Sequence, residues 1–318
     1  MTRTIYFLLV IITGLTLTVC NVRNSASDNH SQEPSDEPVE IIPDIIVPQL
    51  PDQLDESSGM ILFRELLWTI NDSGGEAALY GFDRNTGEVK QVVRIENGEN
   101  DDWESLASSQ QQIFIGDFGN NWGNRKNLGI YVIDKSDIPA TGDVSLSAER
   151  IDFSYSDQTN FNFGPNNNPY DCEAFIWFRD SLFLFTKDWV TRNTKVYAMP
   201  AKPGMYKVEP VDSFAVKCLI TGADISQNRE KLVLLGYADY VPYIWYFDGI
   251  NKGKLLSGKS IQLSMTEYFG TQTEGIAFSG NDTLFISSEQ SQLPSRIYRY
   301  VLDEDGFWSR ETPSAKGG

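Results

Sequence analysis

Five acidic residues recur along the chain, and each is followed by a short apolar run. The intervals between them are 48, 69, 51 and 50 residues. If each acid opens the inner strand of one repeating unit, the five carboxylates converge around a common axis. Carboxylate oxygens are the hard donors that Ca²⁺ and Mg²⁺ prefer, so the spacing predicts a divalent metal site. Its ring acids are Glu56, Glu104, Glu173, Asp224 and Glu274.

Three more oxygen donors stand where second strands are expected to end. Asn71, Asp72 and Asp117 follow apolar runs and should reach the same face as the ring acids. We include them in the metal set. Asn, Asp and Gly also dominate ordinary turns for backbone reasons, so a purely structural role for these segments stays open.

The absence of histidine from the predicted domain limits the kinds of catalytic and metal site that it can contain. His30 is the only histidine and precedes the predicted domain, so Ser-His-Asp and Cys-His arrangements and histidine-ligated zinc are excluded there. Cys172 and Cys218 are predicted to be buried thiols without a disulfide.

Three residues are candidates for catalysis. Glu104 or Glu173 would act as the base, and Lys187 would stabilise developing negative charge. The alternative is structural: acids at strand starts can accept hydrogen bonds from the backbone of neighbouring units and hold a ring closed. Three aromatic residues that follow second strands are candidates for contacting a ligand: Trp122, Trp189 and Tyr240.

A second marker supports a real repeat. An aliphatic residue followed by an aromatic one recurs at intervals of 51, 66, 48 and 53 residues. Both markers lengthen in the same interval, which predicts one insertion near residues 156–169. The repeated aromatic residues are expected to pack as core between units: Tyr80, Tyr131, Tyr197, Trp245 and Tyr298.

The repeat predicts an all-β fold. The first four units each offer four short β-rich runs within roughly 40–50 residues, which is typical of a β-propeller blade. Five blades fit, and six remain open if two are merged across the insertion. Expected fourth strands are residues 88–95, 149–155, 212–220 and 260–264. The last unit lacks one, so residues 39–48 are predicted to close the ring.

The N-terminal part has a different composition. Residues 1–20 combine Arg3 with a short apolar run and end at Cys20 in a lipoprotein-type processing box, so they are predicted to be a signal peptide. Residues 21–39 form an acidic tether that is expected to be disordered, and residues 40–318 form the propeller. We therefore expect export and lipid anchoring through Cys20 at the outer membrane or cell surface, or else a periplasmic or secreted protein.

The charge narrows the range of partners. A formal net charge of −18 argues against nucleic acid, because phosphates repel an acidic surface. The expected partner is a small anionic or sugar-derived ligand, or a surface protein or glycan. Membrane contact is expected only through the lipid anchor, and the chain is expected to be a monomer.

Residues 56–300 resemble bacterial calcium-dependent β-propellers of the phytase-like and gluconolactonase-like types. The resemblance is carried by the ring acids and the Asn71-Asp72 turn, whereas the lactonase-like members generally have six blades. It implies Ca²⁺ or another divalent cation in the channel and hydrolysis of phosphate esters or lactones. The processing box and tether look like lipoproteins of Bacteroidetes type. The alternative function is a non-catalytic propeller that binds a glycan, peptide or protein partner.

Overall fold

Short runs of β-branched and aromatic residues form almost all the regular structure. The computed structural model describes residues 37–72, 74–250, 255–303 and 307. Its strands form five sheets of four or five strands each. From the inside outward, the main strands of blade 1 are β3 (Ser57–Phe63), β4 (Leu66–Asn71), β5 (Ala78–Asp83) and β6 (Val89–Ile95), and those of blade 2 are β7 (Trp103–Ser108), β8 (Gln112–Asp117), β9 (Gly129–Asp134) and β11 (Glu149–Tyr155). In the same order, blade 3 contains β12 (Asp171–Phe178), β13 (Ser181–Lys187), β14 (Thr194–Pro200) and β16 (Pro210–Phe214), and blade 4 contains β17 (Leu219–Ile225), β18 (Lys231–Ala238), β19 (Val241–Asp248) and β20 (Lys259–Ser264). Blade 5 contains β21 (Thr273–Ser279), β22 (Thr283–Ser288), β23 (Arg296–Val301) and β2 (Asp44–Val47).

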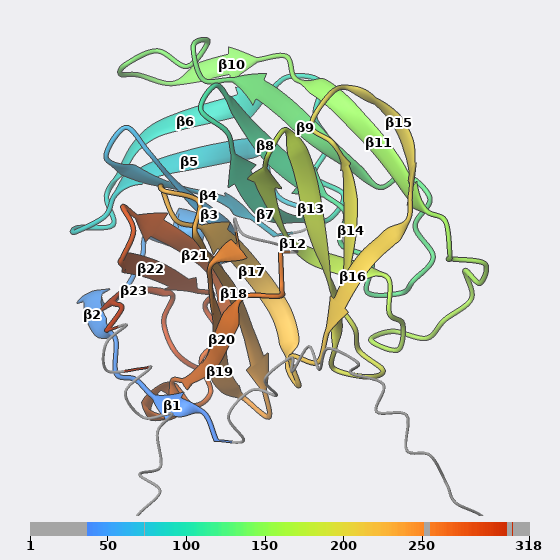
Figure 1. Cartoon of the computed structure of the whole chain (residues 1–318). Coiled ribbons are helices and arrows are strands. Elements are labelled where there is room, and N and C mark those ends of the chain that lie inside the picture. Colours follow the sequence, from blue (N-terminus) through green and yellow to red (C-terminus); the bar gives the residue numbers. More distant parts are fainter. Residues whose placement is uncertain (1–36, 73, 251–254, 304–306, 308–318) are drawn as a thin grey trace, which may run out of the picture. The chain divides into compact units, whose positions relative to one another are not determined.

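The five sheets make a five-bladed β-propeller (Figure 1). The inner strands contact one another in a closed series: β3 with β7, β7 with β12, β12 with β17, β17 with β21, and β21 with β3. Within each blade the main strands are antiparallel neighbours. The predicted fold class and five-blade count are confirmed.

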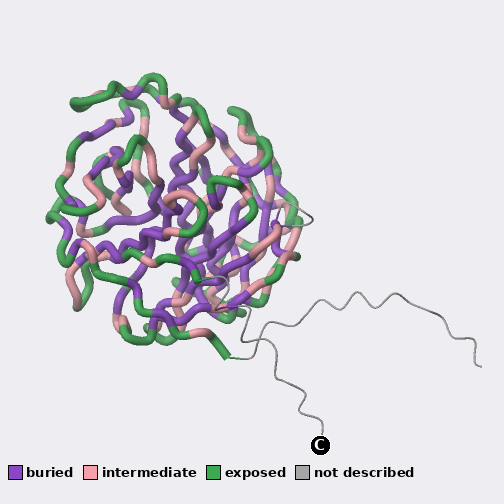
Figure 2. The backbone as a smooth tube through the Cα atoms, turned by 60° about the vertical axis from the view of Figure 1, so that its left-hand side comes forward, coloured by how far each residue is buried: buried purple, intermediate pink, exposed green. Residues whose placement is uncertain are grey.

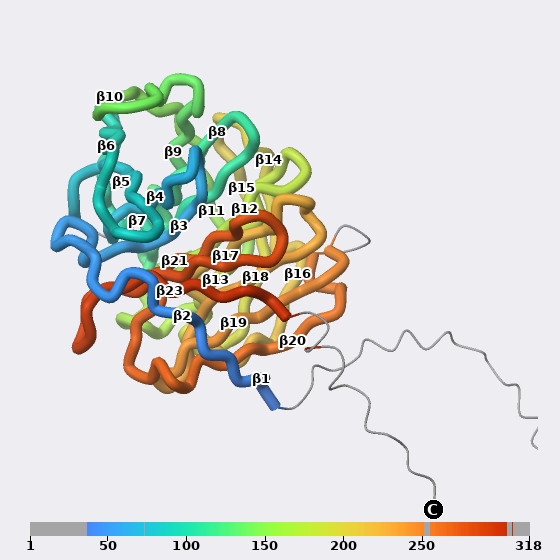
Figure 3. The backbone as a smooth tube through the Cα atoms, turned by 90° about the vertical axis from the view of Figure 1, so that its left-hand side faces the viewer, coloured from blue at the N-terminus to red at the C-terminus, as the bar shows by residue number. Residues whose placement is uncertain are grey.

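An N-terminal strand closes the ring. β2 pairs antiparallel with β23, so the beginning of the described chain supplies the outer strand of the last blade. β1 (Val39–Glu40) pairs parallel with β20 of blade 4. Figure 3 shows β2, in blue, running beside β23, in red. The prediction that residues 39–48 close the ring is confirmed for residues 44–47, whereas residues 39–40 extend the sheet of blade 4.

The core lies between the blades. Each hydrophobic cluster joins side chains from successive blades, and Figure 2 shows the buried segments gathered in the interior, with exposed segments around them. The predicted core aromatics are all buried: Tyr80, Tyr131, Tyr197, Trp245 and Tyr298.

Two short strands extend outer edges. β10 (Val144–Leu146) pairs parallel with β6, and β15 (Gly204–Val208) pairs parallel with β11. Each belongs in sequence to the following blade and covers backbone groups at an edge that would otherwise be free to pair with another chain.

One predicted strand is wrong. Residues 212–220 were expected to be the outer strand of blade 3, but this strand ends at Phe214 and Leu219 already begins blade 4. A tight turn in which the Val216 N–H donates to the Phe214 carbonyl separates the two. Cys218 therefore precedes an inner strand. Cys172 lies on β12, and both cysteines are free and buried, as predicted.

The predicted signal peptide, Cys20 and most of the predicted tether lie outside the described residues. Among the residues that are described, no helix has the length and apolar character needed to cross a membrane.

Candidate functional site

Every inner strand carries a register irregularity near its first residues. At these places the inner strand has one more residue than its partner, the arrangement of a β-bulge, which re-aims a side chain. The extra residues occupy equivalent positions in the five blades: Gly59, Glu104, Glu173, Thr221 and Glu274. Three of the five predicted ring acids therefore occupy the predicted repeat position.

Glu56 and Asp224 do not occupy this ring. Glu56 is exposed and precedes the bulge of blade 1 by three residues. Asp224 follows the bulge of blade 4 by three residues and pairs across the sheet with Val233, towards the other end of the strand. Its carboxylate accepts hydrogen bonds from the backbone N–H groups of Ile225 and Phe278 at 2.8 and 2.7 Å. Placing these two acids in the ring was wrong.

For blade 4, the aromatic marker holds the signal that corrects the ring position. Thr221 lies 48 residues after Glu173 and 53 residues before Glu274. The same two intervals separate Tyr197, Trp245 and Tyr298 in the aromatic marker. Aligning the two markers strictly would have selected Thr221, although it is not an acid.

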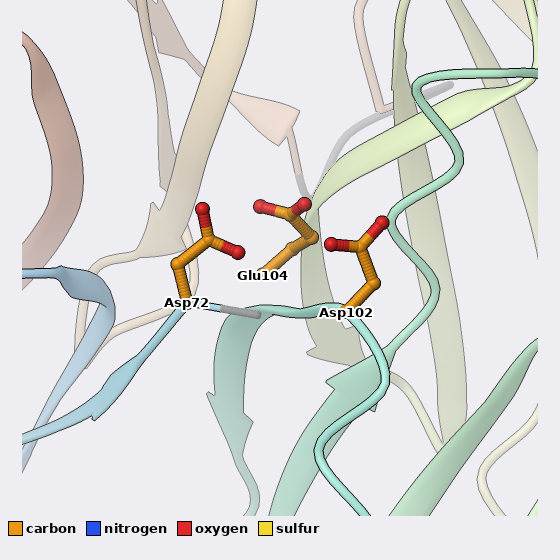
Figure 4. Close-up of side chains that lie close together, drawn as sticks. All are labelled: Asp72, Asp102 and Glu104. Carbon is orange, nitrogen blue, oxygen red and sulfur yellow. The ribbon is translucent and has the colours of Figure 1, made fainter. Parts of the chain in front are cut away.

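Three carboxylates converge at the end of the inner-strand ring where β7 begins. We call this end of the ring the channel mouth. Asp72, Asp102 and Glu104 each offer an oxygen atom, and these atoms all lie within 4.8 Å of one another. Figure 4 shows the three side chains facing one another. This arrangement brings together two predicted ligands and adds Asp102.

Backbone contacts fix the three acids. Asp72 directly follows β4, and its N–H donates to the Glu56 carbonyl at 3.0 Å. The Asp102 N–H donates to the Asp117 carboxylate at 3.3 Å. Glu104 lies in the bulge of β7, and its carbonyl accepts a 2.6 Å hydrogen bond from Ser58 of the preceding blade. Two blades therefore cooperate in placing the triad.

A glycine leaves room for the triad. A Cβ atom at position 119 would lie 2.3 Å from Oε1 of Glu104 and 2.5 Å from Oδ2 of Asp102. Both are closer than van der Waals contact allows. Gly119 therefore lets the backbone of the loop after β8 approach both carboxylates.

Burial and mutual repulsion raise the pKa values of these acids. Burial, then Asp72, raises the pKa of Asp102 to about 7, although Arg125 opposes the shift. Burial raises the pKa of Glu104 well above its usual value, and neighbouring Glu173 and Asp72 raise it further. Converging acids of this kind bind a proton or a cation more readily than isolated acids do.

A buried lysine neutralises part of this charge. Nζ of Lys187 lies 3.1 Å from Oε1 of Glu173, and also 4.9 Å from the ring centroid of Trp189 and 5.6 Å from that of Tyr237. Burial alone would lower the pKa of Lys187, but Glu173 and Glu274 raise it above its usual value. The lysine is therefore held in its charged form.

Glu274 and Glu289 extend the acidic region. Burial raises the pKa of Glu274 to about 7, with Lys187 opposing the shift. Burial and Glu274 raise that of Glu289 to about 9. Within the described part of the chain, Oε2 of Glu274 has no hydrogen-bond partner. We call Asp72, Asp102, Glu104, Glu173 and Glu274 the acidic cluster.

Asp117 has a different environment from the triad. Its carboxylate accepts hydrogen bonds from Arg125 at 2.8 Å and Arg150 at 3.3 Å, and its side chain is buried. Two guanidinium groups already neutralise it, so this geometry does not favour the predicted metal role. Asn71 donates to the Gln53 carbonyl at 2.9 Å, while its buried Oδ1 has no partner among the described residues.

Asp102 and Asp171 belong to the site but are not in the metal set predicted from the sequence. Asp171 is buried and accepts hydrogen bonds from the Asn120 N–H at 2.6 Å and from the Trp189 indole at 2.7 Å. Both acids stand two residues before a bulge glutamate in the motifs Asp-Trp-Glu and Asp-Cys-Glu. That repetition was the available signal.

The three candidate ligand-contacting aromatics fall into two groups. Trp189 is partly buried and holds Asp171 in place. Trp122 and Tyr240 are exposed by 57% and 72%. Only these two offer ring surface to a partner.

The chain matches no protein-family model and no curated protein. Among solved structures, it is similar to a PQQ-bound aldose sugar dehydrogenase from Streptomyces coelicolor, with a TM-score of 0.47 and 10% identity over 81% of this chain and 96% of that chain. A putative 6-phosphogluconolactonase from Bacteroides uniformis gives 0.39 and 13% over 80% and 69%, and a glucose dehydrogenase gives 0.44 and 8% over 80% and 99%. Similarity at this level carries no inference about substrate or cofactor.

Proposed function

We propose that the chain is a divalent-cation-dependent hydrolase that acts at the channel mouth on a phosphoester or on a sugar-derived lactone or ester. The observation that carries the proposal is the convergence of Asp72, Asp102 and Glu104 within 4.8 Å. Export and lipid anchoring through Cys20 belong to the same proposal.

The donor set suits Ca²⁺. Oxygens that bind one Ca²⁺ at about 2.3–2.6 Å lie no more than about 5 Å apart, and the triad satisfies this limit. All three donors are carboxylates, the hard ligands that calcium prefers over soft ones. A cation here would also offset the repulsion that raises the pKa values of Asp102 and Glu104.

The remaining residues supply the other parts of a hydrolytic site. A bound cation would polarise a substrate oxygen or lower the pKa of a water molecule. Glu173, which lies beside Lys187 in the acidic cluster, is the candidate base, and burial raises the pKa of its carboxyl group, which favours uptake of a proton. Lys187 would stabilise negative charge that develops on the substrate.

The exposed rings of Trp122 and Tyr240 favour a second candidate function. In this alternative the propeller is not catalytic and binds a glycan, peptide or protein partner at the same face. The acidic cluster then serves to hold the blades together.

Thermal unfolding of the full-length protein in EDTA, followed by addition of Ca²⁺, Mg²⁺ or Mn²⁺, tests the hydrolase proposal. A cation that binds only the native state raises the unfolding midpoint. We expect Ca²⁺ to raise it by several degrees and the Asp72→Asn, Glu104→Gln double variant to abolish the shift. The control is Asp137→Asn, Glu149→Gln, which removes two exposed carboxylates.

A positive shift justifies a screen with phosphomonoesters and sugar lactones. Glu173→Gln should then abolish turnover and leave the calcium-induced shift in place. An unchanged midpoint with all three cations contradicts the proposal and leaves the binding function.

A further inference from the structure

A cavity opens near the acidic cluster. It has a volume of about 320 Å³ and lies between the β18–β19 hairpin and the loop that follows the 3₁₀ turn η3 (Thr266–Tyr268). Tyr237 connects the two sites, because its ring lines the cavity and also faces Nζ of Lys187. The volume is at the lower end of the range for small-molecule sites, roughly 300–1,000 Å³.

Two exposed aromatic rings form the outer wall. Tyr240 is 72% exposed and Phe269 is 61% exposed, and their rings meet edge to face at 6.1 Å between centroids. The Gly270 N–H donates to the Tyr240 carbonyl at 2.8 Å, which ties the loop to the hairpin. These two rings face solvent and do not pack in the core. Together they form an apolar wall, which is a feature of ligand-binding sites.

Tyr240 also has a backbone conformation that is unfavourable for a residue with a bulky side chain. It has a φ of 67° and follows Asp239 with a φ of 51°. These are the two central residues of a tight hairpin, where Asn-Gly is the usual choice, and a bulky side chain at positive φ is rare. The chain therefore keeps an exposed aromatic ring where glycine would cost less.

Thr271 and Gln272 are polar residues of the cavity wall. Thr271 lines it, is only 4% exposed, and has a hydroxyl group without a hydrogen-bond partner in the described part of the chain. A buried polar group left unpaired costs about 1–3 kcal/mol. The Gln272 amide lies at the same wall and donates to Glu289 at 2.6 Å, so it links the cavity with the acidic region.

We propose that this cavity binds the ring of a sugar and directs the sugar's ester or lactone group towards the acidic cluster. A pyranose ring has apolar C–H faces, which suit Tyr240 and Phe269, and a rim of hydroxyl groups, which suit Thr271 and Gln272. No arginine or lysine is among the described residues that line the cavity, so a phosphate group is a poor occupant. The inference rests on the proposed function only for the position of the reacting group.

Saturation-transfer NMR on the full-length protein in EDTA tests the binding without any catalysis. The probes are D-glucose, D-galactose, D-mannose and their methyl glycosides. We expect transfer to ring C–H protons of at least one probe. Tyr240→Ala and Phe269→Ala should each weaken its Kd by about fivefold, the scale of one aromatic contact, whereas Tyr240→Phe should keep the affinity.

Two further variants make the test specific. Thr271→Val keeps the shape but removes the hydroxyl, and should weaken binding severalfold without lowering the unfolding midpoint. Met205→Ala removes an exposed apolar side chain that does not line the cavity and should leave binding unchanged. If no probe shows transfer, or if Tyr240→Ala and Phe269→Ala both bind as tightly as the parent, the proposal is wrong.

The calcium-induced midpoint shift, measured on the same proteins, separates this proposal from the hydrolase proposal. Sugar binding without a calcium-induced shift supports the proposed sugar site and contradicts the proposed cation site. A calcium shift without sugar binding supports the metal site and removes the cavity as a sugar subsite.

Discussion

The ammonium group of Lys187 lies 3.1 Å from a carboxylate oxygen of Glu173, and both side chains are buried. Glu173 comes from the bulge of β12, and Lys187 ends the neighbouring β13. The pair therefore joins the two innermost strands of blade 3 at the channel mouth. It also places a positive charge beside acids that otherwise repel one another.

Replacing Lys187 with Met should destabilise the metal-free protein in a pH-dependent way. Leaving one buried charge unpaired costs about 3–5 kcal/mol, and this is the loss in unfolding free energy that we expect at pH 8. At pH 5 the loss should be smaller, because Glu173, whose pKa is already raised, can take up a proton. Urea unfolding at the two pH values measures the difference, with exposed Lys202→Met as the control. Equal losses at both pH values would show that the charge is not the cause.

The metal-free protein should lose stability as the pH rises from about 4 to 9. Asp102 and Glu274 have pKa values near 7 and Glu289 near 9, all above their values in an unfolded chain. In this window the native state holds more protons than the unfolded state, so the unfolding free energy falls as the pH rises. Thermal unfolding in EDTA at pH 5 and pH 8 should give the higher midpoint at pH 5. Saturating Ca²⁺ should reduce the difference; a midpoint that rises with pH contradicts the electrostatic description of the cluster.

Changing Asp117 to Asn should cost stability but spare cation binding. The buried carboxylate pairs with Arg125 and Arg150, and breaking a buried ion pair costs about 3 kcal/mol or more. The calcium-induced midpoint shift should survive, because Asp117 is not one of the three converging acids. Asp152→Asn, which removes a partly exposed partner of Arg150, should cost less than about 1 kcal/mol. Loss of the calcium shift in Asp117→Asn would instead restore Asp117 as a ligand.

The repeat could be predicted because two independent markers in the sequence recur at similar intervals. The acidic and aromatic markers each recur five times at similar intervals, so the number of blades follows from their spacing. The exact ring position was harder. A bulge adds one residue to a strand, and Glu56 and Asp224 each stand three residues away from the bulges of their blades, where they resemble the acidic marker.

The contacts of Asp117 could not be predicted in the same way. Its partners lie 8 and 33 residues further along the chain. Arg125 is in a loop, and Arg150 is on the outer strand β11. No period of the sequence connects these positions; only the folding of blade 2 brings them together.

Truncating the closing strand should loosen the ring. Val47 is the last residue of β2, is 2% exposed, and packs with Leu50, Phe285 and Ile297. Val47→Ala should lower the unfolding free energy by roughly 2 kcal/mol, since deleting buried methyl groups removes hydrophobic contacts and leaves a cavity. Ile42→Ala, at an exposed position just before β2, should change it by less than about 0.5 kcal/mol. Denaturant unfolding compares the two, and equal effects would contradict a closing role for β2.

Adding one methyl group at Gly119 should damage the proposed cation site and leave the fold in place. The new Cβ would collide with carboxylate oxygens of Glu104 and Asp102. These are the ends of side chains that can move aside, so the cost to folding should be small while the triad is spread. We expect Gly119→Ala to unfold in EDTA within a few degrees of the parent and to lose most of the calcium-induced shift. Gly164→Ala is the matched control, because a Cβ there meets nothing within 4 Å; a full calcium shift in Gly119→Ala would mean that the cation, if bound, is held elsewhere.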